Sequence, residues 1–197
     1  AGEKIVVYGD YDVDGITSTT LLMRMLQRLG ANAAYYIPDR IKEGYGFHKE
    51  ALEHIAGAGA GLLISVDCGI SALEETAAMH GKLDIIITDH HLPQAELPDV
   101  EAVINPHRED CPYPEKNLAG VGVAFKLCQA LWQRIKKTDF EADLEIVALG
   151  TIADIVPLLG ENRRIVYQGL KQMVQTDIIG LQALIEAAGL KDKAIGE

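Results

Sequence analysis

Short apolar runs recur along the first half of the chain, and stretches with helical spacing separate most of them. Five runs have the length and the Val, Ile and Leu content of buried strands: residues 5–8, 33–37, 62–66, 85–88 and 102–104. After the first run, the apolar positions in residues 21–29 keep the spacing of one helix face, and Gly30 follows as a stop signal. This alternation predicts a mainly parallel sheet with helices on its faces.

The pattern changes after residue 104. A proline-rich segment, NPHREDCPYPEKNLAG, is followed by helical patterns over residues 121–135, 144–155 and 164–174. Ser71-Ala-Leu-Glu74 has the form of a capping box, which predicts that a helix begins there. We therefore expect an α/β fold, in which helices sandwich a five-stranded, mainly parallel sheet and a helical C-terminal part follows.

The composition is that of a globular chain. The 197 residues, 48% of them hydrophobic, are enough to bury a core. No apolar run approaches the roughly 18–20 residues of a membrane helix, and no leader is recognisable, so we expect a cytoplasmic protein without membrane contact. Cys68, Cys111 and Cys128 form no Cys-x-x-Cys pair and are expected to be reduced thiols. The missing initiating Met and the ending KAIGE lead us to expect a piece of a longer chain.

The net charge of −11 argues against a general coating of nucleic acid, because a phosphate backbone attracts Lys and Arg. Bound divalent cations would offset part of this charge, and a local basic stripe can coexist with an acidic remainder. The candidates for such a stripe are Arg24, Arg28, Arg40, Lys42 and Lys49. The alternative for each of them is solvated surface.

Acidic and histidine side chains follow three of the predicted strands. Ligands of open α/β sheets gather at the carboxyl ends of the strands, so these side chains are expected to meet. Such a cluster of carboxylates is costly unless something positive compensates it, and carboxylate oxygens with imidazole nitrogens suit Mn²⁺ or Mg²⁺. An acid inside the apolar segment GTIADIVPL is expected to join them. The residues are Asp10, Asp12, Asp14, Asp67, Asp89, His90, His91 and Asp154.

The segment DYDVDG has two other interpretations. It opens like the calcium loop of an EF-hand, but the twelfth position, which needs a bidentate Glu, is Leu21, so that interpretation fails. The other is a turn whose aspartates cap the next helix. This second alternative stays open at the level of the sequence.

Five segments in this order resemble the successive motifs of the DHH phosphoesterase superfamily. They are GDYDVDG, SVDCGIS, TDHH, LAGVGVAFKL and GTIADIVPL, and the similarity extends from about residue 4 to residue 160. GDYDVDG together with INPHREDCPYP resembles the RecJ branch of single-strand-specific 5′-to-3′ exonucleases more than the relatives that act on small substrates.

The resemblance implies a role for each of these residues. Asp12 would hold one metal ion, Asp14, His90 and Asp154 a second one, and Asp67 would bridge the two. His91 would face the substrate phosphate, so that His91 and Asp67 are the expected catalytic residues. Asp10 and Asp89 would orient loops or histidines from behind, with plain turn or cap aspartates as the alternative. Gly120 and Gly122 would offer backbone amides to a phosphate, with close packing as the alternative.

One position departs from the superfamily pattern. Several members carry a histidine ligand four residues before the first ligand aspartate, and this chain has Tyr8 there. Because a neutral tyrosine is a poor ligand, the ion at Asp12 is expected to be more weakly held and more hydrated.

The resemblance implies a metal-dependent phosphodiesterase core of a RecJ-like exonuclease that uses two Mn²⁺ or Mg²⁺ ions. Its substrate would be single-stranded DNA, its products 5′-mononucleotides and its processes recombination and DNA repair, while helicase or repair partner proteins stay unidentified. Residues 1–160 would form the catalytic domain, and residues 161–197 a helical extension leading to a second domain. The alternatives are a phosphoesterase for short oligonucleotides, cyclic dinucleotides or pyrophosphate, and a non-catalytic scaffold module.

Overall fold

Five parallel strands form the centre of the structure, a computed structural model that describes residues 2–191 and 193. The sheet order is β2-β1-β3-β4-β5, and every neighbouring pair is parallel. The prediction of five strands is confirmed, and each observed end lies within one residue of the expected one. The strands are β1 (Lys4–Gly9), β2 (Asn32–Tyr36), β3 (Leu62–Val66), β4 (Asp84–Thr88) and β5 (Ala102–Ile104).

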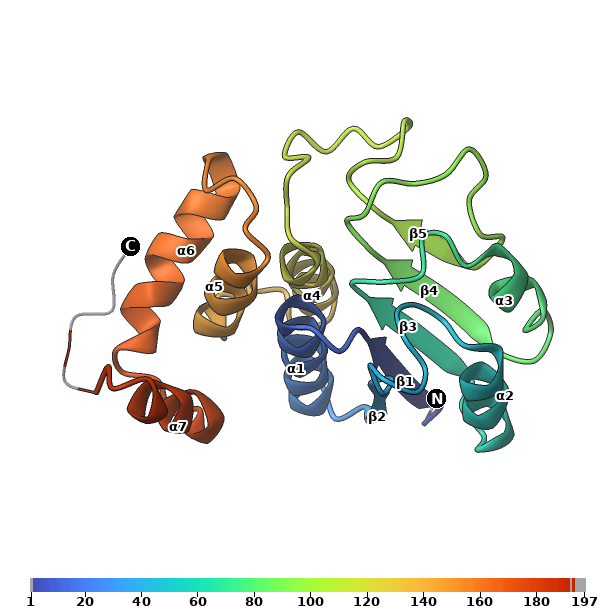
Figure 1. Cartoon of the computed structure of the whole chain (residues 1–197), viewed down its shortest axis with the longest axis horizontal. Helices are drawn as coiled ribbons and strands as arrows, with labels where there is room; N and C mark the ends of the chain where they lie inside the picture. The colour runs from blue at the N-terminus through green and yellow to red at the C-terminus, as the bar shows by residue number, and fades with distance from the viewer. Residues whose placement is uncertain (1, 192, 194–197) are drawn as a thin grey trace.

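Helices cover both faces of the sheet (Figure 1). Because side chains alternate along a strand, Val7 and Ile64 point into one core and Val6 and Leu63 into the other. The first core is closed by α1 (Val13–Arg28) and α4 (Gly120–Lys136). The second is closed by α2 (Lys49–Gly57) and by Ala72 and Met79, which flank α3 (Leu73–Ala77). The expected sandwich of helices around the sheet is confirmed.

Three more helices lie outside the layer of α1 and α4 (Figure 1). They are α5 (Leu144–Ala153), α6 (Gly160–Met173) and α7 (Ile179–Ala187), so the helical C-terminal part is confirmed. Gly169 of α6 lies against the backbone of Leu144, where a Cβ atom would have no room, and α5 and α6 therefore pack closely. None of the helices among the described residues is long and apolar enough to span a membrane.

The predicted capping box at residues 71–74 is wrong. Helix α3 begins at Leu73, its N-cap is Ala72, and no side chain caps its described backbone amides. Ser71 lies one residue too early because the chain first makes a turn after β3, in which Gly69 has a φ of +109°. The turn is fixed instead by Asp89 Oδ2, which accepts a hydrogen bond of 3.0 Å from Ile70 N.

A buried ion pair joins α1 to α5. Asp143 is 5% exposed and accepts hydrogen bonds at Oδ1 from Arg24 Nε (3.0 Å) and Arg28 Nη2 (2.9 Å). Two of the five residues proposed for a basic stripe are therefore paired with a buried acid from a distant part of the sequence, although their own side chains stay 33% exposed. The contact joins α1, which carries Asp14, to α5, whose C-cap is Asp154.

Replacing Asp143 by Asn is expected to lower the free energy of unfolding by about 2–4 kcal/mol at neutral pH, because two arginines lose their shared carboxylate. Asn suits this position, where φ is +62°. Burial raises the pKa of Asp143, but hydrogen bonds from Arg28 and Arg24 outweigh it and hold the pKa below its ordinary value of 3.8. The stabilisation is therefore present above that value and is lost as the pH falls through the lower pKa of the folded state.

Urea denaturation of both proteins measures this effect as a function of pH. The difference between wild type and Asp143→Asn is expected to be constant around neutral pH and to shrink below about pH 4. An equal difference in acid and at neutral pH would contradict the role assigned to the ion pair.

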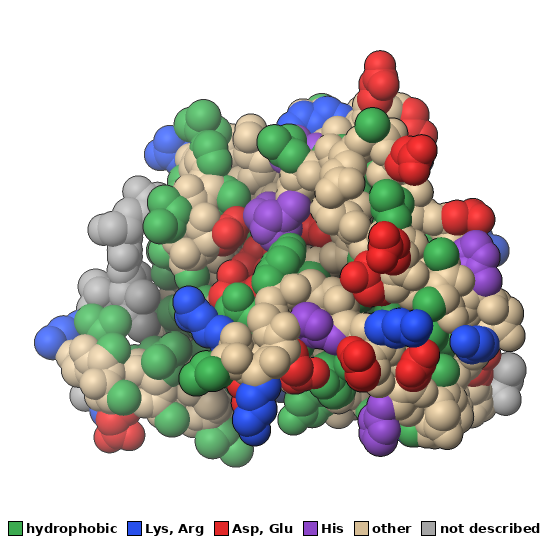
Figure 2. All heavy atoms as spheres, turned by 45° about the vertical axis from the view of Figure 1, so that its right-hand side comes forward, with side chains coloured by type: hydrophobic (Ala, Val, Ile, Leu, Met, Phe, Trp, Pro, Cys, Tyr) green, Lys and Arg blue, Asp and Glu red, His purple; other side chains and the backbone are tan. Residues whose placement is uncertain are grey.

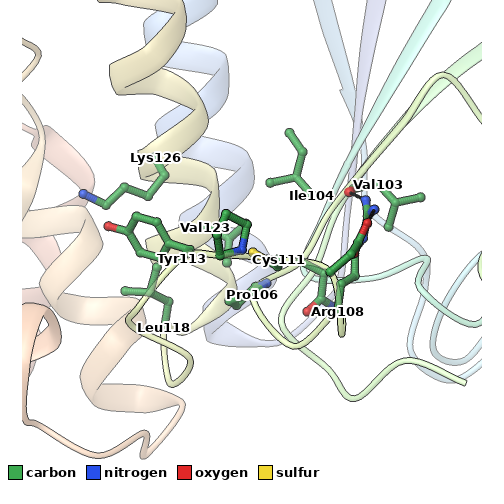
Figure 3. Close-up of a pocket in the computed structure, with 12 residues that line it drawn as sticks. Val103, Ile104, Pro106, Arg108, Cys111, Tyr113, Leu118, Val123 and Lys126 are labelled. Atoms are coloured by element: carbon green, nitrogen blue, oxygen red, sulfur yellow. Dashed lines mark hydrogen bonds and ion pairs between the residues drawn. The ribbon is translucent and has the colours of Figure 1, made fainter.

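The proline-rich segment after β5 closes over a cavity of about 330 Å³ (Figure 3). Apolar side chains such as Tyr113, Leu118 and Val123 line it. Lys116 Nζ fastens the segment by donating to the carbonyl oxygens of Pro106 (2.8 Å) and Cys111 (2.7 Å). The cavity contains none of the acids and histidines expected to bind metal.

Candidate metal centre

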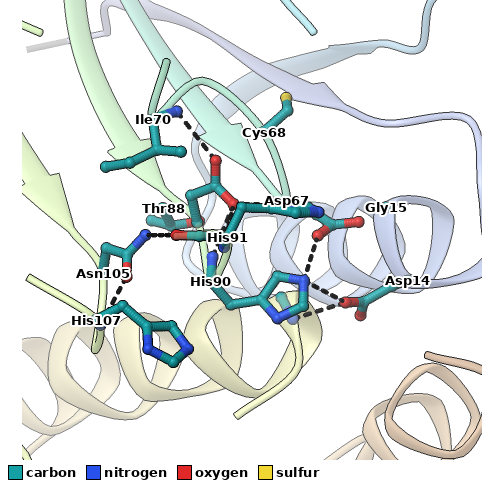
Figure 4. A network of polar contacts seen from close by, with 12 residues as sticks. Asp14, Gly15, Asp67, Cys68, Ile70, Thr88, His90, His91, Asn105 and His107 are labelled. Atoms are coloured by element: carbon teal, nitrogen blue, oxygen red, sulfur yellow. Dashed lines mark hydrogen bonds and ion pairs between the residues drawn. The ribbon is translucent and has the colours of Figure 1, made fainter. Parts of the chain in front are cut away.

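The residues that follow β1, β3 and β4 meet at one edge of the sheet. Gly9 pairs with Val66, and Val66 pairs with Thr88, so the three strands end at the same level. Their next residues therefore face a common space, as the sequence predicts. Figure 2 shows carboxylate and histidine side chains gathered in a hollow of the surface, and Figure 4 shows the His90 ring between Asp14 and Asp67.

The candidate ligands form three overlapping groups. In each group, one ligand atom of every residue lies within 4.8 Å of the others. His90 belongs to two groups: its Nε2 is 3.2 Å from Asp67 Oδ1 and its Nδ1 is 3.8 Å from Asp154 Oδ2. The three groups are Asp14, His90 and Asp154; Asp67, His90 and His91; and Asp10, Asp12 and Asp67.

Two helix N-termini hold the first aspartates in place. Asp12 is the N-cap of α1, and its Oδ1 accepts a hydrogen bond of 2.9 Å from Gly15 N. Asp14 is 2% exposed, and its two oxygens accept from the amides of Gly120 (2.6 Å) and Val121 (2.8 Å) at the start of α4. The helix-capping interpretation thus describes Asp12 correctly, and it coexists with membership of the cluster.

The two glycines at the start of α4 pack against their neighbours. The amide of Gly120 donates to Asp14, and a Cβ atom at Gly120 would lie 2.6 Å from Asp67 Oδ1. A Cβ atom at Gly122 would lie 3.3 Å from Leu118. The geometry favours the close-packing alternative over the offer of these amides to a phosphate.

Replacing Gly120 by Ala is expected to lower the free energy of unfolding by about 1–3 kcal/mol, because the methyl group overlaps Asp67 at the fixed end of β3. Gly180→Ala is the matched control, since no atom lies within 4 Å of a Cβ atom there. The control is expected to be neutral or slightly stabilising, because Ala favours the helix more than Gly does. An equal decrease in the free energy of unfolding of the two variants, measured by urea denaturation, would contradict the close packing of Gly120 on Asp67.

The electrostatics of the cluster favour a cation. Burial raises the pKa of Asp67, and the nearby Asp14 and Asp12 raise it further; burial also raises the pKa values of Asp14, Asp10 and Asp154. Asp10 Oδ1, Asp67 Oδ1 and Asp154 Oδ2 are buried without a hydrogen-bond partner among the described residues. Crowded, unpartnered carboxylate oxygens beside an imidazole are a donor set that fits Mn²⁺ or Mg²⁺.

Asp89 lies behind this cluster and has its oxygens occupied. It is fully buried and accepts hydrogen bonds from Ile70 N (3.0 Å), His90 N (2.7 Å) and His91 Nδ1 (2.8 Å). Burial raises the pKa of Asp89, but these hydrogen bonds lower it overall. The same contact raises the pKa of His91, whose side chain is 47% exposed. Asp89 thus fixes the His91 ring through Nδ1 and leaves Nε2 for a ligand.

Tyr45 is a site residue that the sequence analysis missed. Its hydroxyl group is 3.1 Å from His91 Nδ1 and 3.4 Å from the carbonyl oxygen of Asp67. It lies between Gly44 and Gly46, both with positive φ, in the loop between β2 and α2. The two glycines permit this backbone conformation, but nothing in the sequence indicated the direction of the tyrosine side chain.

Comparison with known proteins places this geometry in a family. The profile described as "DHH family, N-terminal domain" matches residues 4–151. The chain belongs to the DHH family. Over 188 residues, this DHH domain is 50% identical to the single-stranded-DNA-specific exonuclease RecJ of Bacillus subtilis, covering 95% of the chain and 23% of that protein. Over 203 residues, it is 40% identical to RecJ of Escherichia coli, covering 95% of the chain and 35% of that protein.

Solved structures resemble the DHH domain as well. The crystal structure of exonuclease RecJ bound to manganese matches with a TM-score of 0.86 and 39% identity, over 98% of this chain and 49% of that one. RecJ of Thermus thermophilus in complex with Mn²⁺ matches with a TM-score of 0.81 and 36% identity, over 98% of this chain and 28% of that one. The chain thus spans about a quarter to a half of the relatives described here.

Proposed function

We propose that this DHH domain is the metal-dependent phosphodiesterase core of a 5′-to-3′ exonuclease that degrades single-stranded DNA to 5′-mononucleotides in recombination and DNA repair. The observation that supports this most strongly is the convergence of five candidate ligand residues from four distant segments in one cluster of overlapping groups. Relatives with similar sequences are named single-stranded-DNA-specific exonucleases. The five residues are Asp12, Asp14, Asp67, His90 and Asp154.

The donor geometry supports two ion sites. Asp14, His90 and Asp154 would hold one Mn²⁺ or Mg²⁺ ion, and Asp12 the other. Asp67 belongs to groups on both sides, and it would bridge the ions because a carboxylate has two oxygens and an imidazole cannot bridge. When bound, such a pair of ions lowers the pKa of a water molecule and neutralises charge on phosphoryl oxygens.

The protein's own side chains position the substrate phosphate. His91 would donate a hydrogen bond from Nε2 to a phosphoryl oxygen, since its Nδ1 is held by Asp89. The ionised Asp89 favours the protonated imidazole, which stabilises negative charge as it develops in the transition state. Tyr45 lies against the same ring and limits its rotation. The amides at the start of α4 would orient Asp14 and favour its ionised form, against the burial that raises its pKa.

An assay of the full-length protein that contains this chain tests the proposal. We expect 5′-mononucleotides to be released from 5′-labelled single-stranded DNA when Mn²⁺ or Mg²⁺ is present, and release to stop when a chelator is added. Duplex DNA and cyclic dinucleotides serve as competing substrates. Faster hydrolysis of cyclic dinucleotides, or no hydrolysis of any of them, would contradict the proposal.

A further inference from the structure

Tyr8, at the end of β1, is not available as a metal ligand. Its side chain is fully buried, and its hydroxyl group donates a hydrogen bond of 3.0 Å to the carbonyl oxygen of Gly46. The ring stacks on Tyr36 and meets the edge of Phe47, with centroid distances of 5.2 and 5.0 Å. Tyr8 thus fastens the loop that carries Tyr45, and any further ligand for the ion at Asp12 comes from another residue.

Asp10 differs from Asp89, although the sequence analysis gave both the same orienting role. Asp89 accepts hydrogen bonds from three backbone amides and the ring of His91. Asp10 is 3% exposed, and its Oδ1 is buried with no hydrogen-bond partner in the part of the chain that the structure describes. Burial raises the pKa of Asp10 and hydrogen bonds from the backbone amides of Tyr11 and Asp12 lower it, but Oδ1 still has no partner, whereas both oxygens of Asp89 are used.

The carboxylate of Asp10, with its unpartnered Oδ1, lies beside two other carboxylates. Asp10, Asp12 and Asp67 each offer an oxygen within 4.8 Å of the others. No lysine or arginine among the described residues forms an ion pair with any of the three. Gly15 packs so closely on the backbone of Asp10 that a Cβ atom would lie 2.7 Å from its Cα, which fixes residue 10 beside the cluster. Three carboxylates held this close favour a cation between them, because without one their charges repel each other.

We propose that Asp10 is itself a ligand of the ion held by Asp12 and Asp67, in place of the orienting role expected from the sequence. This inference rests on the proposed two-ion function. It makes the two ion sites chemically different, because one is built from carboxylates alone and the other contains His90. The all-carboxylate site is expected to accept Mg²⁺ as readily as Mn²⁺, whereas the site with the imidazole is expected to prefer Mn²⁺.

A thiolate at residue 10 tests for direct contact with the ion. In the full-length protein, Asp10→Cys is expected to show the ultraviolet charge-transfer band of a cadmium–thiolate bond when Cd²⁺ is added, because sulfur is a soft ligand that Cd²⁺ binds strongly. Asp12→Cys is the positive control and Asp89→Cys the negative one. The wild type supplies the baseline for the native cysteines, among them Cys68 and Cys128, which are buried. A band with Asp12→Cys but none with Asp10→Cys would overturn the inference.

A second variant keeps the test decisive if Asp10→Cys does not fold. Asp10→Asn preserves the shape of the side chain, and Mn²⁺ titration is expected to show one of the two sites weakened by more than about 100-fold, beyond the roughly 10- to 100-fold loss caused by residues that only orient a ligand. Two unchanged sites would overturn the inference and leave the proposed function intact. A wild-type protein that binds no Mn²⁺ would overturn both.

Discussion

Replacing Asp67 by Asn is expected to remove tight binding of both metal ions, and with it at least about a thousandfold of the rate of DNA hydrolysis. Asp67 belongs both to the ligand group with Asp12 and to a group with His90. An amide in its place has only one oxygen to offer a cation. Asn suits the left-handed backbone of residue 67, where φ is +62° and Ala would add strain. Titration calorimetry with Mn²⁺ and a nuclease assay measure the two effects.

The same substitution is expected to stabilise the metal-free protein. Asp67 is 2% exposed, and burial together with Asp14 and Asp12 raises its pKa, so its charge is unfavourable in the absence of an ion. Urea denaturation with chelator present should therefore show a higher free energy of unfolding for Asp67→Asn than for wild type. Asp84→Asn, at the exposed opposite end of the sheet, is the matched control and should change neither property. Two tight Mn²⁺ sites in Asp67→Asn would contradict the bridging role.

Replacing His91 by Ala is expected to slow turnover by about 100- to 1,000-fold and to leave both Mn²⁺ affinities unchanged. The reason is that Asp89 holds Nδ1 and the other nitrogen is left for a phosphoryl oxygen. Steady-state kinetics and Mn²⁺ titration of the full-length protein separate the two properties.

The control for this variant is His54→Ala, which removes an exposed histidine from α2. It should leave turnover unchanged. An unchanged rate in His91→Ala would contradict the phosphate role. Loss of one Mn²⁺ site would instead show that His91 is a metal ligand, since His91 also lies within reach of a group with Asp67 and His90.

The strands and the cluster at their ends can be read from the sequence for one physical reason. Buried parallel strands are short apolar runs, and the residue after each run lies at the same edge of the sheet. Asp10, Asp67 and Asp89 follow three such runs, so their proximity needs no knowledge of tertiary contacts. The ends of β1, β3 and β4 agree with the prediction to within one residue.

Contacts made by side chains far apart in the sequence follow from no local pattern. Arg24 and Asp143 are 119 residues apart, and Gly120 donates to Asp14 across 106 residues. Tyr45 contacts His91 from a loop that the buried Tyr8 holds through a hydrogen bond to the carbonyl oxygen of Gly46. The sequence presents Asp10 and Asp89 as equivalent aspartates, and only the occupied oxygens of Asp89 distinguish them.

The number of Mn²⁺ ions bound per chain near neutral pH tests the central claim most directly. The account predicts two ions in wild type, because Asp67 belongs both to the group with Asp10 and Asp12 and to a group with His90. Titration calorimetry with elemental analysis of the dialysed protein gives this number without any assumption about substrate. A single ion, or none, would contradict the account.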